Sequence, residues 1–126
     1  MKIVVDTSIL IDYLRGGTKW EHLLSEVEKD IEIYLPTIVV FELFSGKSSH
    51  KPQASRDIVD FIKYFQRIEL TEEIAKKAGE LYRDVSKTLQ VPDYIVAASA
   101  LDIGGTVVTL NKKHFAQIPH LSLYPL

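Results

Sequence analysis

The chain has 126 residues, with 15 basic and 17 acidic side chains, a formal net charge of −2 and no cysteine. This length suits one domain, residues 1–126, whose core needs no covalent staples. The lack of cysteine excludes a disulfide framework and a thiolate zinc site, and it fits a reducing cytoplasm. No apolar run approaches the roughly 20 residues of a membrane span, and the N-terminus has no signal-peptide pattern.

Short apolar runs that are typical of buried strands alternate along the chain with segments of helical periodicity. Strands are predicted over residues 2–6, 31–35, 67–70, 106–109 and 121–124. Helices are predicted over about 9–14, 19–29, 37–46, 92–103 and 112–115, after Pro52 with an apolar face to Phe65, and after Thr71 with an apolar face to Leu89. Strands that alternate with helices predict an α/β fold, with a mainly parallel sheet covered on both faces.

Residues that typically start and end helices support several of these boundaries. Thr37 can cap the helix that follows it, and Gly46 lies just past the end of that helix. Pro92 fits the first turn of a helix, where its missing N–H costs nothing. Within the apolar segment TIVVFELF, we expect Phe41 and Phe44 to belong to the core rather than to a base-stacking surface.

Three carboxylates stand in otherwise apolar surroundings. Asp6 ends the first predicted strand, Glu42 lies within TIVVFELF, and Asp93 lies in the first turn of a helix. Taken singly, each has an ordinary explanation: Asp6 as a helix cap, Asp93 as a first-turn acid, Glu42 as a solvated side chain. A buried acid is costly unless it is paired or bound to a metal, and ligands of parallel sheets bind beyond the carboxyl ends of strands. Together the three indicate a site for hard cations.

Four blocks in order, VVDTSILIDYL, FELFSG, VPDYIVAASAL and VVTLNKKHF, span nearly the whole chain. In their sequence and spacing they resemble PIN-domain ribonucleases, and most closely the toxins of VapBC toxin–antitoxin pairs. The resemblance implies a three-layer α/β/α sandwich around a parallel sheet of about five strands. It also implies a Mg²⁺- or Mn²⁺-dependent endoribonuclease that hydrolyses RNA phosphodiester bonds.

By this resemblance, the first three acids of the family fall on Asp6, Glu42 and Asp93, which would hold the metal and carry the catalysis. Ser8 matches a small polar position that supports the acidic cluster, and Thr109 matches the threonine at the end of the fourth strand. The family often has a fourth acid just beyond this threonine.

In this chain the place of the fourth acid is taken by Asn111 or by His114, depending on the alignment, and neither is a carboxylate. We treat Asn111 as the candidate catalytic residue at this position. The departure leaves open how many metal ions bind. It also leaves open a PIN-like module that has lost activity and only binds RNA or a protein.

An RNA substrate needs cations to offset the acidic site, because the chain as a whole is slightly negative. Lys47, Lys51 and Arg56 follow Glu42 in the sequence, and Lys112 and Lys113 follow Thr109. For each side chain alone, ordinary solvated charge explains the residue. As a set they flank two site blocks, and we select Lys47, Lys112 and Lys113 as candidate substrate-binding residues.

The resemblance also implies partners. We expect a cognate VapB-type antitoxin whose C-terminal segment crosses the acidic groove, and a homodimer. A PIN nuclease of RNA processing outside toxin–antitoxin systems is the alternative within the family. A haloacid-dehalogenase-type phosphatase also begins with a strand that ends in Asp, but it needs a second acid where Ser8 stands.

Overall fold

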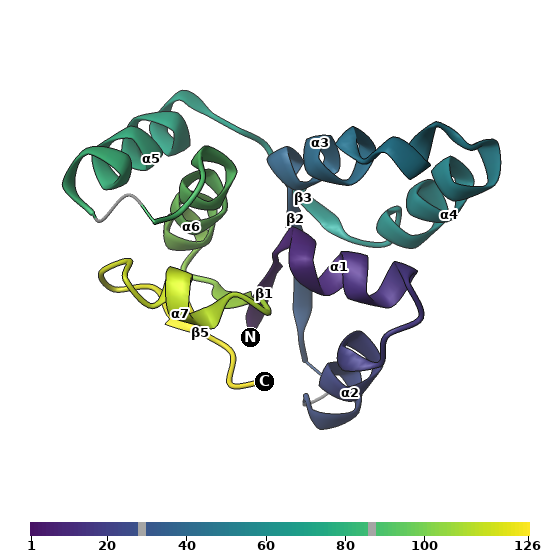
Figure 1. The fold of residues 1–126 in the computed structure, drawn as a ribbon. Coiled ribbons are helices and arrows are strands. Elements are labelled where there is room, and N and C mark those ends of the chain that lie inside the picture. Colours follow the sequence, from purple (N-terminus) through teal and green to yellow (C-terminus); the bar gives the residue numbers. More distant parts are fainter. Residues whose placement is uncertain (28–29, 86–87) are drawn as a thin grey trace.

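The computed structural model describes residues 1–27, 30–85 and 88–126. Strands and helices alternate along these ranges (Figure 1). In chain order the elements are β1 (Lys2–Val5), α1 (Thr7–Leu14), α2 (Lys19–Glu26), β2 (Glu32–Pro36), α3 (Thr37–Ser45), the 3₁₀ helix η1 (Lys47–His50), α4 (Pro52–Ile62), β3 (Gln66–Ile68), α5 (Glu72–Asp84), α6 (Val91–Ile103), β4 (Thr106–Val108), α7 (Lys112–Phe115) and β5 (Ser122–Leu123).

In the described part of the chain, five strands form one sheet in the order β3-β2-β1-β4-β5, and every neighbouring pair is parallel. This confirms the predicted parallel sheet. The chain builds outward from β1 to β2 and β3, then crosses to the other side of β1 to add β4 and β5. The strand order therefore reverses between β1 and β4, and in such sheets ligands bind in the crevice beyond the carboxyl ends of the strands at this reversal.

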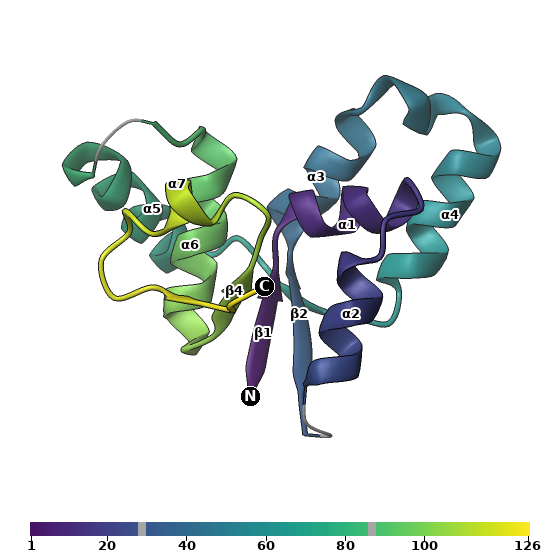
Figure 2. The same ribbon diagram turned by 60° about the horizontal axis from the view of Figure 1, so that its bottom comes forward.

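Helices cover both faces of the sheet, which confirms the predicted three-layer sandwich. Helices α1, α2 and α4 lie on one side and α5 and α6 on the other (Figures 1 and 2). Helix α3 follows β2 directly and contacts both α1 and α6. This contact brings α3 from one flank of the sheet and α6 from the other to the edge where β1 and β4 end.

The central strands are apolar throughout because both of their faces are covered. Ile3, Val4 and Val5 of β1 and Val107 and Val108 of β4 are fully buried. Each such side chain contributes roughly 1.5–3 kcal/mol of hydrophobic stabilisation. The strand ends that carry polar side chains are therefore fixed to a rigid base.

Aromatic side chains attach α1 to the two helices beside it. The rings of Tyr13 and Phe61 stack with centroids 4.2 Å apart, and Trp20 packs against Phe65 at 5.4 Å. Trp20 and Phe61 also meet edge to face at 6.0 Å. Pairs of this kind contribute about 0.5–1.5 kcal/mol beyond the area that they bury. The cluster thus fixes α1 against α2 and α4.

Thr37 is not the cap that the sequence predicts. It is the first residue of α3, the cap position belongs to Pro36, and no side chain caps this helix end. The reason lies in the strand before it, because β2 runs to Pro36 and the helix follows without a connecting residue. Gly46, as predicted, lies just past the end of α3.

Three predicted helices are longer than the observed ones. Helix α2 ends at Glu26, and residues 28–29 of its predicted span lie outside the described residues. Helix α4 ends at Ile62 and helix α5 ends at Asp84, and residues 86–87 of the span predicted toward Leu89 lie outside the described residues. Phe65 and Leu89 are nevertheless buried from the segments that follow these helices. These two residues continue the helical spacing of apolar side chains beyond the helix ends because they also pack on the core.

Candidate active site

Asp6 follows β1 directly and is buried, with 2% of its surface exposed. It occupies the cap position of α1, but its carboxylate makes no capping hydrogen bond. Instead, Oδ2 accepts hydrogen bonds from Ser8 Oγ at 2.9 Å and from Thr109 Oγ1 at 2.7 Å. Oδ1 receives no side-chain hydrogen bond from the described residues. The explanation of Asp6 as an ordinary helix cap is therefore wrong.

The two hydroxyls that hold Asp6 are themselves held by the backbone of the segment after β4. The backbone N–H of Leu110 donates to Ser8 Oγ at 2.9 Å, and that of Asn111 donates to Thr109 Oγ1 at 3.0 Å. Each hydroxyl has one proton, and both protons point to the carboxylate of Asp6. This arrangement joins the ends of β1 and β4 and fixes the orientation of the carboxylate.

Glu42 comes to the same place from α3. Its Oε1 accepts a hydrogen bond of 2.7 Å from Thr7 Oγ1, the residue after Asp6. Burial raises the pKa of the Glu42 carboxyl above its ordinary value, and the bond from Thr7 opposes this rise. The negative charges of Asp6 and Asp93 raise the pKa of Glu42 further. Glu42 is thus a half-buried acid within electrostatic reach of two others.

Asp93 is the third residue of α6 and forms a capping box with Gln90. Its Oδ2 accepts a hydrogen bond of 3.1 Å from the backbone N–H of Gln90, whose side chain in turn accepts from the backbone of Asp93. Burial raises the pKa of the Asp93 carboxyl, with a further rise from Asp6, while the Gln90 bond and the nearby His114 act in the opposite sense. The ordinary first-turn role of Asp93 is therefore real, and it coexists with its place in the acidic cluster.

The three acids thus converge from three elements at the reversal of the strand order. Their oxygen donors suit a hard cation, and Mg²⁺ in particular retains several waters and needs only one or two carboxylates. Among the described residues, no group of three or more acidic, histidine or cysteine side chains is arranged so that it could hold a metal ion as it stands. Without a cation between them, the three negative charges repel one another.

The candidates for the fourth position lie at α7. Asn111 is exposed and precedes this helix, and its backbone bond to Thr109 anchors it beside the cluster. His114 is also exposed, and its charge reaches Asp93. Both residues therefore lie near the acids, with Asn111 on the β4 side and His114 toward α6.

The three candidate lysines differ in whether their side chains have a hydrogen-bond partner. The Nζ of Lys112 donates a 2.9 Å hydrogen bond to the carbonyl oxygen of Leu126. Lys47 in η1 and Lys113 in α7 are exposed, and the described residues give their side chains no hydrogen bond or ion pair. Lys47 and Lys113 are thus available to a ligand as they stand, whereas Lys112 first has to leave its partner.

Sequence reasoning was wrong about Phe41 and Phe44 and missed Thr7 and Gln90. Phe41 is 63% exposed and Phe44 is 36% exposed, because the face of α3 that packs on the core carries Val39 and Leu43. Gln90 has a readable signal, since a polar residue three places before an acid at a helix start is the pattern of a capping box. Thr7 has none beyond its position next to Asp6.

Comparison with known proteins agrees with this geometry. Residues 3–121 match the family model of the PIN domain. The chain is 30% identical to ribonuclease VapC19 of Mycobacterium tuberculosis, over 94% of this chain and 95% of the relative. It is 32% identical to ribonuclease VapC of Rickettsia bellii, over 98% and 95% of the two chains.

A solved structure of VapBC2 from Rickettsia felis, bound to a DNA fragment from its promoter, superposes with a TM-score of 0.85. The identity is 25%, and the match covers 98% of both chains. The chain therefore belongs to the PIN-domain family, within which its curated relatives are ribonucleases of the VapC type. Across the described ranges, no helix is long and apolar enough to span a bilayer.

Proposed function

We propose that this protein is a metal-dependent endoribonuclease that hydrolyses RNA phosphodiester bonds and acts as the toxin of a type II toxin–antitoxin pair. The observation that carries the proposal is the buried carboxylate of Asp6, held by two hydroxyls at the reversal of the strand order. Glu42 and Asp93 lie within electrostatic reach of it. The VapC names of the relatives support the same reaction.

In this proposal Asp6, Glu42 and Asp93 hold a divalent cation, Mg²⁺ or Mn²⁺. An ion held there would supply Lewis-acid chemistry for hydrolysis of a phosphodiester, lowering the pKa of a water and offsetting negative charge. The chain contributes fixed ligand orientations: Ser8 and Thr109 orient Asp6, Thr7 orients Glu42, and the Gln90 backbone orients Asp93.

The residues around the cluster have further parts in this scheme. Asn111 is neutral, and its amide oxygen can accept a hydrogen bond from a water beside the acids. Lys47 and Lys113 are exposed cations on the two sides of the acidic cluster, in η1 and α7, and would bind substrate phosphates. Lys112 would join them once it releases Leu126.

The deciding experiment measures cleavage of a pool of structured RNAs with Mg²⁺, with Mn²⁺ and with EDTA. We expect cleavage that EDTA abolishes and that Asp6→Asn or Asp93→Asn lowers by at least about 100-fold, because both substitutions keep shape and remove charge. Cleavage that survives EDTA, or that both variants retain, would overturn the proposal. RNA binding without any turnover would favour the alternative of a PIN-like module that only binds, for which the missing fourth acid is the motivating feature.

The toxin assignment rests on a partner. The similar structure from R. felis is a VapBC pair, and we propose a VapB-type antitoxin for this chain, with its C-terminal segment across the acidic groove. Phe41 and Phe44, exposed on α3 next to Glu42, offer an apolar surface that an antitoxin would cover. Co-expression with the product of the neighbouring gene should give a stable complex with inhibited cleavage. Without a complex, the processing nuclease outside toxin–antitoxin systems becomes the better assignment.

A homodimer is the remaining part of the proposal. An apolar groove of about 300 Å³ lies between α5 and α6, lined by side chains that include Leu70, Ala75 and Val91. Leu70 is 46% exposed and Val91 is 60% exposed, which suits contact with a second copy. Light scattering should therefore give twice the chain mass, and Val91→Glu should shift the protein toward the monomer. A monomeric wild-type protein would exclude the dimer.

A further inference from the structure

Helix α1 begins beside the acidic cluster and leads to a basic residue, Arg15, at its other end. Ser8, Ile11 and Arg15 follow one another at helical spacing, and Arg15 caps the C-terminal end of the helix. A hollow of about 200 Å³ lies between α1 and α3, lined by Glu42, Ser48 and Arg15 among others; we call it the Glu42 hollow. A second hollow of about 440 Å³, the Ser8 hollow, is lined by Ser8, Ile11, Arg15 and Leu110 among others.

Arg15 thus lines both the hollow that contains Glu42 and the hollow that contains Ser8, whose hydroxyl bonds to Asp6. None of Lys47, Lys112 and Lys113 lines either hollow. A cation that lines two hollows beside the acidic cluster is well placed to meet the phosphates of a chain that lies across both.

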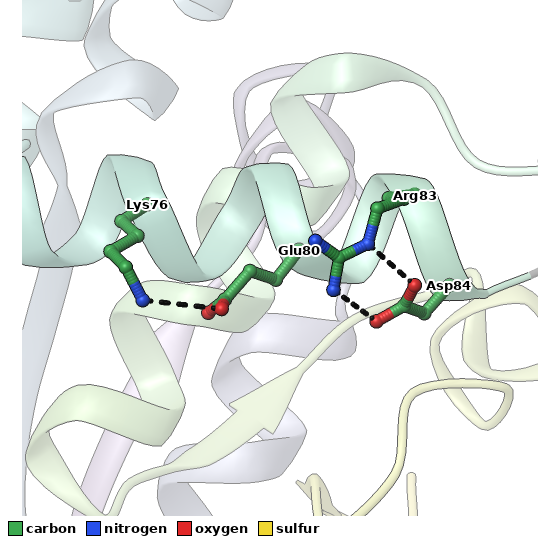
Figure 3. Close-up of polar contacts among 4 residues, drawn as sticks. All are labelled: Lys76, Glu80, Arg83 and Asp84. Atoms are coloured by element: carbon green, nitrogen blue, oxygen red, sulfur yellow. Dashed lines mark hydrogen bonds and ion pairs between the residues drawn. The ribbon is translucent and has the colours of Figure 1, made fainter.

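The guanidinium of Arg15 is exposed, and the described residues give it no hydrogen bond or ion pair. Other arginines of the chain are engaged. Figure 3 shows Arg83 of α5, whose Nε and Nη2 donate to the two carboxylate oxygens of Asp84 at 2.7 and 2.8 Å. Arg67 donates to the backbone carbonyl oxygens of Ile62 and Phe65. All N–H donors of the Arg15 guanidinium are therefore available to a ligand.

We propose that Arg15 binds a backbone phosphate of the RNA substrate, one that lies away from the bond to be cleaved; this rests on the proposed ribonuclease function. Arg15 lies seven positions after Ser8, which is about 10 Å along the helix axis. The guanidinium therefore contacts a phosphate other than the scissile one. An arginine fork binds phosphate oxygens by paired, charge-assisted hydrogen bonds, which suits it to this task.

Two acids near Arg15 have to be accounted for. Asp57 also lines the Glu42 hollow, and its Oδ1 accepts a 2.7 Å hydrogen bond from Gln53 Nε2. Asp12 lines the Ser8 hollow, and its Oδ2 accepts a 3.3 Å bond from the backbone N–H of Lys19. Both carboxylates have partners of their own. The rival explanation is structural: a cation at the end of α1 stabilises the helix through its dipole.

The binding test uses a fluorescent single-stranded RNA in Mg²⁺, with all proteins in the Asp93→Asn background so that the RNA is not cut. Arg15→Gln should weaken binding roughly tenfold, as expected for loss of a charge-assisted contact. The slope of log affinity against log salt should become shallower by about 0.7, the value for one phosphate of a single strand. Arg83→Gln is the matched control, because it also removes one arginine charge, on α5 away from α1 (Figure 1), and should leave both quantities unchanged.

Cleavage kinetics without the Asp93 change give the second readout. Arg15→Gln should raise KM and leave kcat nearly unchanged, because a contact remote from the reacting bond acts on binding. Arg15→Lys should restore the salt slope and part of the affinity, since it keeps the charge and loses the fork. A structural role would instead lower the melting temperature and leave the salt slope as in the wild type.

The possible results separate this inference from the proposed function. If wild-type protein cleaves RNA, and Arg15→Gln matches Arg83→Gln in affinity and salt slope, the inference is wrong and the ribonuclease stands. If no cleavage occurs but RNA binding depends on Arg15, the ribonuclease proposal is wrong and Arg15 is a phosphate contact of an RNA-binding module instead. If the parent protein binds no RNA, the inference is wrong as well.

Discussion

Thr109 Oγ1 donates a 2.7 Å hydrogen bond to Oδ2 of Asp6, although 103 residues separate the two in the sequence. The bond exists because β1 and β4 are neighbours in the sheet and end at the same edge. It sets the carboxylate of Asp6 before any ligand arrives. Because the Asp6 side chain is already oriented, less conformational entropy is lost when something binds to it.

We predict that Thr109→Val lowers RNA cleavage by about 10- to 100-fold, as loss of a group that orients a metal ligand generally does. It should also lower the free energy of unfolding by about 1–3 kcal/mol, because a buried carboxylate loses a donor. Thr109→Ser keeps the hydroxyl and is the control, with activity near that of the wild type. Equal activity of the valine and serine variants would show that the hydroxyl does not act on Asp6.

Ser8→Ala should have the same kind of effect, and the two changes should not add. Both hydroxyls bond to the same oxygen of Asp6, and groups in one hydrogen-bond network couple. A double-mutant cycle with Thr109→Val measures this coupling in both cleavage rate and unfolding free energy. Strict additivity would mean that the two bonds act independently.

Asp93 allows its structural and chemical roles to be separated. Asp93→Asn keeps an oxygen that accepts the Gln90 backbone bond, whereas Asp93→Ala removes it. Both variants should be inactive, because both lack the carboxylate. Only the alanine variant should lose about 1 kcal/mol of stability, the usual effect of losing a helix-start cap. Denaturant unfolding together with the cleavage assay tests both expectations, and activity in the asparagine variant would remove Asp93 from the chemistry.

The layers of the fold followed from the sequence because apolar periodicity reports burial. Ile3 to Val5 form a continuous apolar run, and such runs occur where a sheet is covered on both faces. The same signal failed at the ends of α4 and α5. Phe65 and Leu89 continue the apolar spacing although α4 ends at Ile62 and α5 at Asp84, because a side chain outside a helix can also pack on the core.

Helix α3 shows where sequence patterns mislead near a site. In TIVVFELF a hydrophobic pattern places Phe41 inside and Glu42 outside, but in the structure Phe41 is exposed and Glu42 is half-buried. Functional sites are the places where such local rules are broken. The position of Glu42 was predicted from the chemistry of converging acids, whereas the exposure of Phe41 had no signal in the sequence.

The half-buried carboxylate of Glu42 lowers the stability of the metal-free protein. Burial and the charges of Asp6 and Asp93 both disfavour ionised Glu42. Glu42→Gln should therefore raise the stability of the metal-free protein, by about 0.5–1 kcal/mol, while abolishing cleavage. Glutamine retains the oxygen that accepts from Thr7, so the local structure is kept.

The matched control is Glu69→Gln, an exposed acid after β3. It should leave both stability and cleavage unchanged. Mn²⁺ should raise the melting temperature of the wild type more than that of Glu42→Gln, because binding to the folded state stabilises it. If Glu42→Gln destabilised the metal-free protein, the acid would be favourable where it is and repulsion would not be the dominant effect.

The number of metal ions is the last prediction. Two divalent ions bring four positive charges, whereas Asp6, Glu42 and Asp93 bring three negative ones, and Asn111 is neutral. We therefore expect one well-held ion in the free protein, with a second recruited together with the substrate phosphate, itself an anionic ligand. Asn111→Asp should tighten binding of the second ion, because a carboxylate at short range in a partly desolvated site attracts it strongly.

Calorimetric titration with Mn²⁺ of the wild type, Asn111→Asp and Asn111→Ala checks this expectation. Two tightly bound ions in the wild type would contradict the single-ion state. If all three proteins agreed in metal binding and in cleavage, Asn111 would lie outside the site. His114→Asp would then be the informative substitution, because the charge of His114 already reaches Asp93 and a carboxylate there would face the same cluster from α7.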